Sequence, residues 1–311
     1  VADAEKALGS LKEDSGTGPD LLPARVLKMF AKELAKPVYL LTLLILSTGT
    51  WPEIWLAHWI VPLFKRKSTF DPNNYRGIHL TSQLSKVVER LLKTMYMPFL
   101  ISTVAYGPNQ FAYTEGRGAR DALALMVLRW VQSFVARLKI GVCCSDVSGA
   151  FDRVESQRLL KKLMAKKIHP DMVRVFASWL RQRVAHIVVE GKQSCEMILK
   201  NMVYQGPVLG PDLWNLFYED ARAAINDCLY TEVVYADDLN AYRVFGAGVE
   251  NASIIKNMKV CQAEVHKWGE ANQVSFDPSK ESMHILSSSE PACDGFKILG
   301  VDFDGALNFT S

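Results

Sequence analysis

The sequence contains no apolar run long enough to cross a membrane. Its most apolar window, Val38–Leu46, falls far short of the roughly 20 residues that a spanning helix needs. The N-terminus also lacks the pattern of a secretory signal peptide. We therefore expect an intracellular protein with no membrane partner, in either the nucleus or the cytoplasm. Pro37, just before this window, predicts a helix break in a buried helical region.

Cysteine is sparse, and its spacing argues against a cysteine-based site. The six cysteines include no CxxC pair and have no pair of histidines nearby, so a structural zinc site is not expected. Thiols that fill small spaces in the core are typical of a reducing, intracellular location. Internal repeats and low-complexity tracts are absent as well.

An excess of charge of one sign is also missing. The 36 basic and 33 acidic residues leave a net charge of +3, so global charge does not indicate a nucleic-acid partner. The stretch from Arg158 to Arg183 is an exception, with eight Lys or Arg residues and a single acid, Asp171. Such a stretch either contacts a phosphate backbone or forms a solvated helix face.

Periodic patterns predict helices and strands that interleave without regular βαβ alternation. The content of 49% hydrophobic and 22% charged residues is ordinary for a globular chain of one large domain or two. We therefore predict an α+β fold in which helices back an antiparallel sheet. Helical patterns cover Ala24–Leu46, Thr81–Ser102, Arg120–Lys139, Ser156–Met164, Asp171–Arg183, Gly210–Cys228 and Ala252–Asn272. Strand-like runs cover Trp59–Leu63, Ile140–Ser145, His186–Val189, Glu232–Tyr235, Asn240–Val244, Glu281–Ile285 and Phe296–Val301.

Two adjacent aspartates, Asp237 and Asp238, interrupt an apolar stretch over residues 232–242. Adjacent like charges repel each other, so the pair favours a divalent cation as its partner. An ordinary hairpin turn with acids at its turn positions is the alternative, and this motif alone does not decide between them.

A second acidic segment lies upstream, where Asp146 follows an apolar run and Asp152 precedes a Leu- and Lys-rich helical pattern. A carboxylate at the end of a buried strand is well placed to meet a hairpin that carries two more. Three carboxylates can hold two Mg²⁺ ions roughly 4 Å apart, an arrangement that serves phosphoryl transfer. Asp152 is interpreted instead as the N-cap of the helix that follows.

Three segments resemble, in order and spacing, the palm motifs of reverse transcriptases. Asp146–Asp152 resembles the first palm motif, Gln205–Asn215 the second, and Tyr235–Asp238 the metal-binding hairpin. The likeness is strongest to the reverse transcriptases of non-LTR (LINE-type) retrotransposons. Three matches in the right order are far more specific than one.

The resemblance covers nearly the whole chain. Further similar segments are Gly18–Asp20 and Leu22–Ala24 of an N-terminal extension, Pro62–Lys67 and Asn74–Ile78 of the fingers, Gln110–Tyr113, Gly116–Gly118 and Asp121–Leu123 between fingers and palm, Phe276–Lys280 of the palm, and Lys297–Val301 of a primer-grip hairpin. The resemblance implies a right-hand polymerase fold, with the extension and helical fingers in residues 1–140 and the palm in residues 141–311. A thumb is expected to be largely absent, and an endonuclease and a thumb are expected in a longer parent polyprotein.

The resemblance also implies the catalytic roles. Asp146, Asp237 and Asp238 are expected to act as catalytic carboxylates and to bind two Mg²⁺ ions, for which Mn²⁺ can substitute. Lys280 is expected to protonate the leaving pyrophosphate, with an ordinary loop lysine as the alternative.

Substrate contacts are assigned in the same way. Arg76 and Lys65 are expected to grip the triphosphate, although Lys65 could equally belong to a solvated loop. Gln205 and Gly206 are expected against the incoming nucleotide and the template, before a helix whose first residue is Pro211.

Phe151 has two open interpretations. The resemblance implies an aromatic gate that crowds the sugar 2′ position and rejects ribonucleotides, whereas the residue alone would be a core aromatic beside a strand. The predicted function is therefore RNA-directed DNA synthesis, with an RNA template, a DNA primer and dNTPs as partners. A maturase- or RNA-dependent RNA polymerase-like enzyme and an inactive remnant that binds nucleic acid without catalysis are the alternatives.

Overall fold

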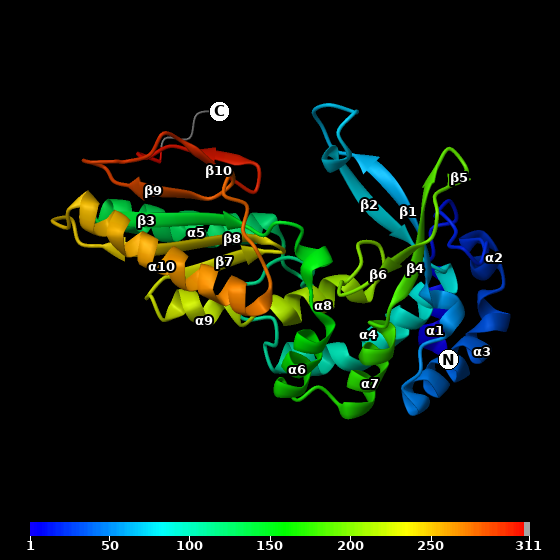
Figure 1. Cartoon of the computed structure of the whole chain (residues 1–311). Helices are drawn as coiled ribbons and strands as arrows, with labels where there is room; N and C mark the ends of the chain where they lie inside the picture. Colours follow the sequence, from blue (N-terminus) through cyan, green and yellow to red (C-terminus); the bar gives the residue numbers. More distant parts are fainter. Residues whose placement is uncertain (308–311) are drawn as a thin grey trace. The chain divides into compact units, whose positions relative to one another are not determined.

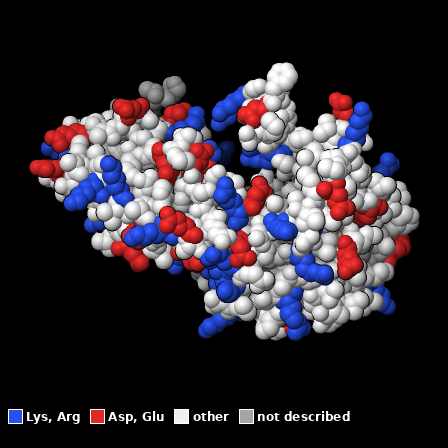
Figure 2. Space-filling model, viewed as in Figure 1, with Lys and Arg blue, Asp and Glu red and all other residues white. Residues whose placement is uncertain are grey.

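The computed structural model describes residues 1–307, which form two compact units (Figure 1). The first unit comprises Val1–Ala105 and Phe151–Phe217, and the second comprises Tyr106–Ala150 and the chain from Tyr218 onward. Each unit combines helices with a sheet, so the predicted α+β class is confirmed. Lys, Arg, Asp and Glu are intermingled on the face shown in Figure 2.

The first unit is built on a mixed sheet with strand order β2-β1-β4-β5, to which β6 adds by pairing with β4. Strand β1 pairs antiparallel with β2 and parallel with β4. The strands are β1 (Ala57–Phe64), β2 (Tyr75–Leu80), β4 (Arg183–Val189), β5 (Lys192–Gln193) and β6 (Met197–Leu199). The helices are α1 (Ala2–Gly9), α2 (Ala24–Met29), α3 (Ala31–Thr48), α4 (Gln83–Ser102), α6 (Ser156–Ala165), α7 (Pro170–Trp179) and α8 (Leu209–Tyr218).

The second unit is built on a four-stranded sheet, β7-β8-β3-β9, in which all neighbours are antiparallel. Its strands are β3 (Lys139–Asp146), β7 (Thr231–Tyr235), β8 (Asp238–Phe245) and β9 (Ser282–Leu286), with a separate hairpin of β10 (Phe296–Ile298) and β11 (Val301–Phe303). Its helices are α5 (Ala119–Val135), α9 (Ala221–Asn226) and α10 (Asn251–Asn272).

Helices α5 and α10 cover opposite faces of this sheet (Figure 1). Trp130 of α5 shares a buried cluster with Ile140 and Val142 of β3. Gly141 lies between those two residues, and a Cβ added there would come within 3.0 Å of Ile254 in α10. Because side chains alternate along a strand, the two helices must lie on different sides of β3.

Most predicted elements are present, but several boundaries differ. The prediction of a helix break at Pro37 is wrong, because α3 runs through this residue to Thr48. Its buried residues, among them Ala35, Val38 and Ile45, recur at helical spacing, so packing outweighs the one backbone hydrogen bond that a proline removes. The predicted helix Ala24–Leu46 is interrupted near Phe30 instead.

Three further differences concern short elements. Helix α1 and strands β2, β5 and β6 have no counterpart among the predicted elements, and β2 forms by pairing along β1 from Tyr75 to Leu80. The predicted helix Gly210–Cys228 consists of α8 and α9. The predicted strand Phe296–Val301 is the β10–β11 hairpin, which turns at Leu299 and Gly300.

Half of the six cysteines are buried, so the prediction that the thiols fill the core holds for these three. Cys143, Cys144 and Cys261 are buried, whereas Cys195 is exposed. Among residues 1–307, no helix is both long and apolar enough to cross a membrane.

Candidate active site

The acidic residues of the second unit meet where β3 ends and the β7–β8 hairpin turns. The register of the sheet places Asp146, the last residue of β3, directly opposite Asp238, the first residue of β8. Tyr235 pairs with Asp238, so Ala236 and Asp237 form a two-residue turn between β7 and β8. The motif is therefore a hairpin turn and also part of an acidic cluster.

Lys280 supplies an ammonium group to this cluster. Its Nζ donates a hydrogen bond to the Asp146 carboxylate, and it lies 3.9 Å from Asp277 Oδ2. The backbone holds this arrangement, because the Asp277 N–H donates to the Asp146 carbonyl at 3.0 Å. The hydrogen bond to Asp146 raises the pKa of Lys280, so the residue stays protonated beside the carboxylates.

The carboxylates carry more negative charge than this lysine balances. Burial, together with the charges of Asp146 and Asp237, raises the pKa of Asp238 to about 6. Asn240 opposes the shift by donating an N–H to Asp238 Oδ1 at 3.2 Å. The protein thus concentrates acids in a place where their ionised form is disfavoured, which costs stability unless a cation is supplied.

The donor set suits a hard divalent cation. Mg²⁺ prefers carboxylate oxygens, and Asp146, Asp237 and Asp238 offer only such atoms. As they stand, however, no three His, Cys, Asp or Glu side chains within residues 1–307 are arranged to hold a metal ion. The chemistry of the residues fits the expected cation, whereas their present side-chain positions serve the Lys280–Asp146 contact.

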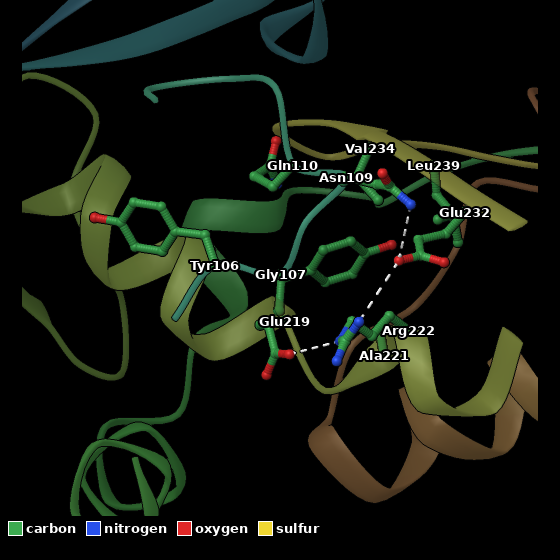
Figure 3. A pocket seen from close by; sticks show the side chains of 11 residues that line it. Tyr106, Gly107, Asn109, Gln110, Glu219, Ala221, Arg222, Glu232, Val234 and Leu239 are labelled. Atoms are coloured by element: carbon green, nitrogen blue, oxygen red, sulfur yellow. Dashed lines mark hydrogen bonds and ion pairs between the residues drawn. The ribbon is translucent and has the colours of Figure 1, made fainter. Parts of the chain in front are cut away.

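A small pocket lies beneath the hairpin in the second unit (Figure 3). Arg222 in its wall donates to Glu219 at 2.7 Å and lies 3.9 Å from Glu232. Glu232 also accepts from Asn109 at 3.4 Å, and burial raises its pKa. Gln110 lines the same pocket, and its Oε1 accepts the N–H of Ala236 in the turn of the hairpin at 3.1 Å.

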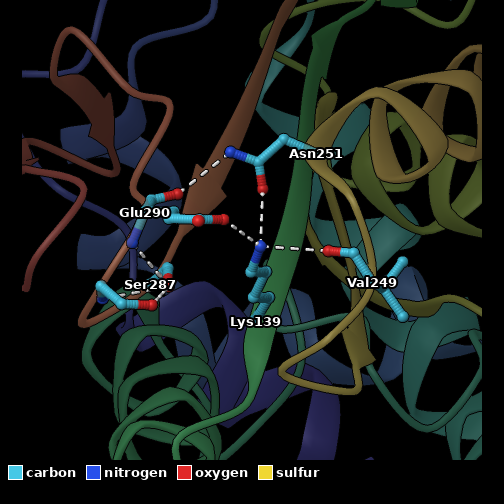
Figure 4. A network of polar contacts seen from close by, with 6 residues as sticks. Lys139, Val249, Asn251, Ser287 and Glu290 are labelled. Carbon is cyan, nitrogen blue, oxygen red and sulfur yellow. Dashed lines mark hydrogen bonds and ion pairs between the residues drawn. The ribbon is translucent and has the colours of Figure 1, made fainter.

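A buried lysine anchors the other end of β3 (Figure 4). Lys139 Nζ donates to the Val249 carbonyl at 3.0 Å, to Asn251 Oδ1 at 3.1 Å and to Glu290 Oε2 at 2.7 Å. These contacts join β3 to the start of α10 and to the segment after β9. A buried ammonium needs such partners because its desolvation is costly.

In the first unit, the Gln205–Gly206 segment is held against strand β2. The His79 N–H donates to the Gln205 carbonyl at 2.8 Å. Gly206 has a φ of +134°, and a Cβ added there would lie 2.3 Å from the His79 carbonyl oxygen. Only glycine allows this approach of the two backbones.

The same loop is anchored at its other end by Glu89, which the sequence analysis did not identify. This side chain of α4 is fully buried, and its Oε2 accepts the N–H groups of Val208 at 2.6 Å and Leu209 at 3.1 Å. Its Oε1 accepts from Ser85 at 3.3 Å and from Trp179 at 3.3 Å. The sequence did contain a signal for this role, because Glu89 lies among the apolar residues on the buried face of α4.

This contact corrects the prediction for Pro211. Helix α8 begins at Leu209, so Pro211 is its third residue rather than its first. The reason is that Glu89 accepts the N–H groups at the start of the helix and thereby fixes where it begins.

A buried network of hydrogen bonds links Arg183 and His58 to His79 of strand β2. Arg183 donates to the Trp179 carbonyl at 2.6 Å and, through Nη1, to His58 Nε2 at 2.6 Å. His58 Nδ1 lies 3.1 Å from His79 Nδ1. Because Arg183 can only donate, His58 accepts at Nε2 and uses its Nδ1–H to donate to His79.

Both histidines of this network are held neutral. Burial lowers the pKa of His58 well below its ordinary value, and the Arg183 charge adds to the effect. Burial and then the Arg183 charge lower the pKa of His79 to about 4. His79 is the residue whose backbone holds Gln205 and meets Gly206, so this network also fixes the loop.

Phe151 is packed close to this loop. It is 7% exposed and stacks on Trp214 with ring centroids 5.9 Å apart. Its carbonyl accepts from the Val203 N–H at 2.9 Å, and it lies close to Gly210. This packing agrees with the core-aromatic interpretation, and the contact with a sugar stays a prediction.

Lys65 and Arg76 lie on the hairpin of β1 and β2, and both are exposed. Arg76 pairs with Leu63 across the hairpin, and the Lys65 N–H donates to the Asn74 carbonyl at 2.8 Å. Their binding of a triphosphate stays a prediction.

The prediction that Asp152 caps a helix is wrong. Glu155 is the N-cap of α6, and its carboxylate accepts the N–H groups of Gln157 at 2.9 Å and Arg158 at 2.8 Å. Asp152 lies in the preceding 3-10 turn, Ala150–Arg153, which ends before the helix starts. Burial raises its pKa, while the charges of Lys65 and Arg153 lower it.

The basic stretch from Arg158 to Arg183 has several internal roles. Arg183 is buried, Lys162 donates to the Phe217 carbonyl at 2.7 Å, and Lys166 donates to the Ala105 carbonyl at 3.1 Å. Arg174 forms an ion pair with Asp171 at 2.7 Å. At least half of its eight cations thus have partners within the protein.

In the second unit, carboxylates and a lysine therefore lie together where β3 ends and β8 begins. The comparison with known families gives the class: residues 65–303 match the family described as "Reverse transcriptase (RNA-dependent DNA polymerase)". The chain belongs to this family.

Its relatives are polymerases of non-LTR retrotransposons. The chain is 23% identical over 327 residues to the RNA-directed DNA polymerase from mobile element jockey of Drosophila melanogaster, covering 100% of this chain and 36% of the relative. The jockey polymerase of Drosophila funebris is 25% identical over 329 residues, with 99% and 35% covered. The Pol polyprotein of the type-1 retrotransposable element R1 of Bradysia coprophila is 25% identical over 286 residues, with 89% and 27% covered. The chain therefore spans 27% to 36% of these relatives' length.

Proposed function

We propose that the chain catalyses RNA-directed DNA synthesis, in which a DNA primer is extended on an RNA template with dNTPs. The observation that carries this proposal is that Asp146, Asp238 and Lys280 lie together where β3 ends and β8 begins, in a chain of the reverse transcriptase family. The fingers with the N-terminal extension would lie in residues 1–140, and the palm in residues 141–311.

The second unit supplies the groups of the chemical step. Asp146, Asp237 and Asp238 would hold two Mg²⁺ ions, which lower the pKa of the primer 3′-hydroxyl and neutralise charge on the leaving pyrophosphate. Lys280, which is held protonated beside Asp146, would give its proton to the pyrophosphate oxygen.

For several residues of the first unit we propose contacts with the substrate. Arg76 offers a planar fork for phosphate oxygens, and Lys65 adds a point charge. The Gln205–Gly206 segment would lie against the incoming nucleotide and the template, because its backbone is rigidly held and its glycine admits close approach. Phe151 would crowd the 2′ position of a ribonucleotide.

Primer extension on poly(rA) with an oligo(dT) primer, dTTP and Mg²⁺ or Mn²⁺ tests this proposal. An Asp237→Asn protein should lose the activity by a factor on the order of 10² to 10³, because an electrostatic stabiliser of the reaction is removed. Asp227→Asn, the same change at an exposed residue of the second unit, should retain it. Equal extension by the wild type and Asp237→Asn would reject the assignment of the acids.

The choice between deoxyribonucleotides and ribonucleotides tests the gate. A Phe151→Val protein should gain incorporation of rNTPs while it keeps incorporation of dNTPs. Unchanged selectivity in a folded variant would reject the role of Phe151.

Binding of nucleic acid without catalysis is the second candidate, and one observation favours it. Lys280 donates a hydrogen bond to the Asp146 carboxylate and so neutralises part of the acidic cluster. A folded wild type that binds primer and template but extends nothing with either metal would support this alternative.

A further inference from the structure

Gln110 connects a buried loop to the turn that carries Asp237. Its side chain is 5% exposed, and its Oε1 accepts the Ala236 N–H at 3.1 Å and the Ala112 N–H at 3.0 Å. Two donors converge on this atom, which identifies it as the amide oxygen, because the amide nitrogen would face both N–H groups as a second donor. The side chain points toward the hairpin from the wall of the pocket (Figure 3).

The backbone around Gln110 follows the first strand of the hairpin. Val234 N–H donates to the Asn109 carbonyl at 3.0 Å, and Phe111 N–H donates to the Val234 carbonyl at 2.9 Å. Gln110 and Val234 therefore form an isolated parallel bridge beside β7. This pairing fixes the position of Gln110 along β7, two residues before Ala236.

Ala236 is a sensitive point of the hairpin. Its φ is +60°, which is unfavourable for a residue with a Cβ, and its side chain is 7% exposed. It directly precedes Asp237 and lies two residues from Asp238. A change in the backbone at Ala236 would rotate both carboxylates relative to Asp146.

We propose that Gln110 is a positioning residue for the acidic hairpin: its amide oxygen holds the strained backbone at Ala236 and so sets the direction of the Asp237 and Asp238 carboxylates. This inference rests on the proposed function only in its consequence for catalysis. The contact itself, and its effect on cation binding, can be measured without any nucleic acid.

The test uses Gln110→Met, which keeps the length of the side chain and removes the strong acceptor. Asn109→Ala is the control, because it removes the contact of the neighbouring side chain with Glu232 and leaves the turn untouched. Both proteins must match the wild type in far-ultraviolet circular dichroism. Amide hydrogen exchange of the segment that contains Ala236, Mn²⁺ affinity by electron paramagnetic resonance, and kcat and KM for dTTP are then measured.

In Gln110→Met we expect exchange at Ala236 and Mn²⁺ dissociation constants to rise about tenfold and kcat to fall about tenfold, the usual scale for groups that orient metal ligands. KM for dTTP should stay within about twofold of the wild type, as it should after loss of an interaction in the chemical step only. Asn109→Ala should match the wild type in all four measurements.

Other results overturn the inference in distinguishable ways. Unchanged exchange at Ala236 would show that the contact does not hold the turn. Faster exchange with unchanged Mn²⁺ affinity would show that the turn does not position the carboxylates. If the wild type binds Mn²⁺ through Asp237 but extends no primer, the proposed function fails, while the first two measurements still decide the role of Gln110. If Asp237→Asn binds Mn²⁺ as the wild type does, both proposals fail.

Discussion

The loop at Gln205–Leu209 in the first unit and the acidic hairpin in the second unit each involve an acid whose pKa is raised by burial, but the two acids have different partners. Glu89, the acid that anchors the loop, is buried, but its two oxygens accept four hydrogen bonds. The three aspartates of the hairpin site share Lys280 as their nearby ammonium group, and the pKa of Asp238 is raised to about 6.

This difference shows which of the two sites has its polar groups satisfied by the protein alone. The loop is satisfied by protein groups, so it can present a fixed surface without a ligand. The hairpin holds charges that repel one another, so it gains from a cation that comes from outside the chain. Removing an acid should therefore destabilise the first unit and stabilise the second.

The largest expected effect comes from Glu89→Ala. It leaves the buried N–H groups of Val208, Leu209 and Trp179 without their acceptor, and should lower the free energy of unfolding by about 4 kcal/mol. The matched control is Glu155→Ala, which removes the more accessible cap of α6 and should cost about 1 kcal/mol. Urea denaturation followed by tryptophan fluorescence measures both. Equal losses would break the comparison, because the buried acid would then be no more than an ordinary cap.

The buried histidines should make the first unit sensitive to acid. The pKa of His79 is about 4 in the folded protein, against an ordinary value of 6.5 in an unfolded chain. Between these values the unfolded chain takes up a proton that the folded chain refuses, so stability present above pH 6.5 is lost as the pH falls to about 4. The loss should reach about 3 kcal/mol.

Denaturation curves between about pH 7 and pH 4 check this expectation. His79→Gln cannot take up a proton at this position, so the variant should lose less stability than the wild type over the same range. Parallel pH profiles of the two proteins would contradict the protonation argument.

The next largest loss of stability is expected for Gly206→Ala. The added Cβ would meet the His79 carbonyl at 2.3 Å, and the φ of +134° is strained for alanine. We expect a loss of about 2 kcal/mol in stability. Gly191→Ala is the control, because Gly191 also has a positive φ, of +76°, but has nothing within 4 Å of the added Cβ. A Gly206→Ala protein as stable as Gly191→Ala would show that the loop is less tightly fixed than we infer.

Asp238→Asn should change stability in the opposite direction. The folded pKa of Asp238, about 6, is above the ordinary value of 3.8, so ionisation costs stability as the pH rises from about 4 to 6. The neutral variant should be more stable than the wild type by up to about 3 kcal/mol at about pH 7, with the gain absent at about pH 4. Thermal denaturation at the two pH values tests this. Adding Mg²⁺ should stabilise the wild type more than the variant, and a variant that is less stable at neutral pH would contradict the picture of repelling charges.

Local patterns were sufficient where an element depends on its own residues. The apolar run before Asp146 predicted β3, and apolar residues at helical spacing predicted α4 and α10. The adjacent acids in Tyr235–Asp238 left a hairpin turn and a cation site open, and the structure contains the turn. These features could be read from the sequence because neighbours along the chain create them.

Local patterns failed where a competing residue decides. Asp152 looked like an N-cap, but Glu155 accepts the N–H groups of α6. Pro211 looked like the first residue of a helix, but Glu89, far upstream in the chain, sets the start of α8. Glu89 became apparent as an acceptor only in the folded chain, whereas Glu155, three residues after Asp152, was a competing cap within the same segment.

The sequence by itself determined the α+β class, the family and the positions of the acidic residues. These features depend on hydrophobic periodicity and motif spacing, which are visible in the order of the residues along the chain. Tertiary structure alone decided that Asp146 lies opposite Asp238, that Lys280 contacts Asp146, and that Gln110 holds the turn. The physical reason is that strand register and buried hydrogen bonds depend on partners far apart in the chain, and these partners meet only through packing of the whole unit.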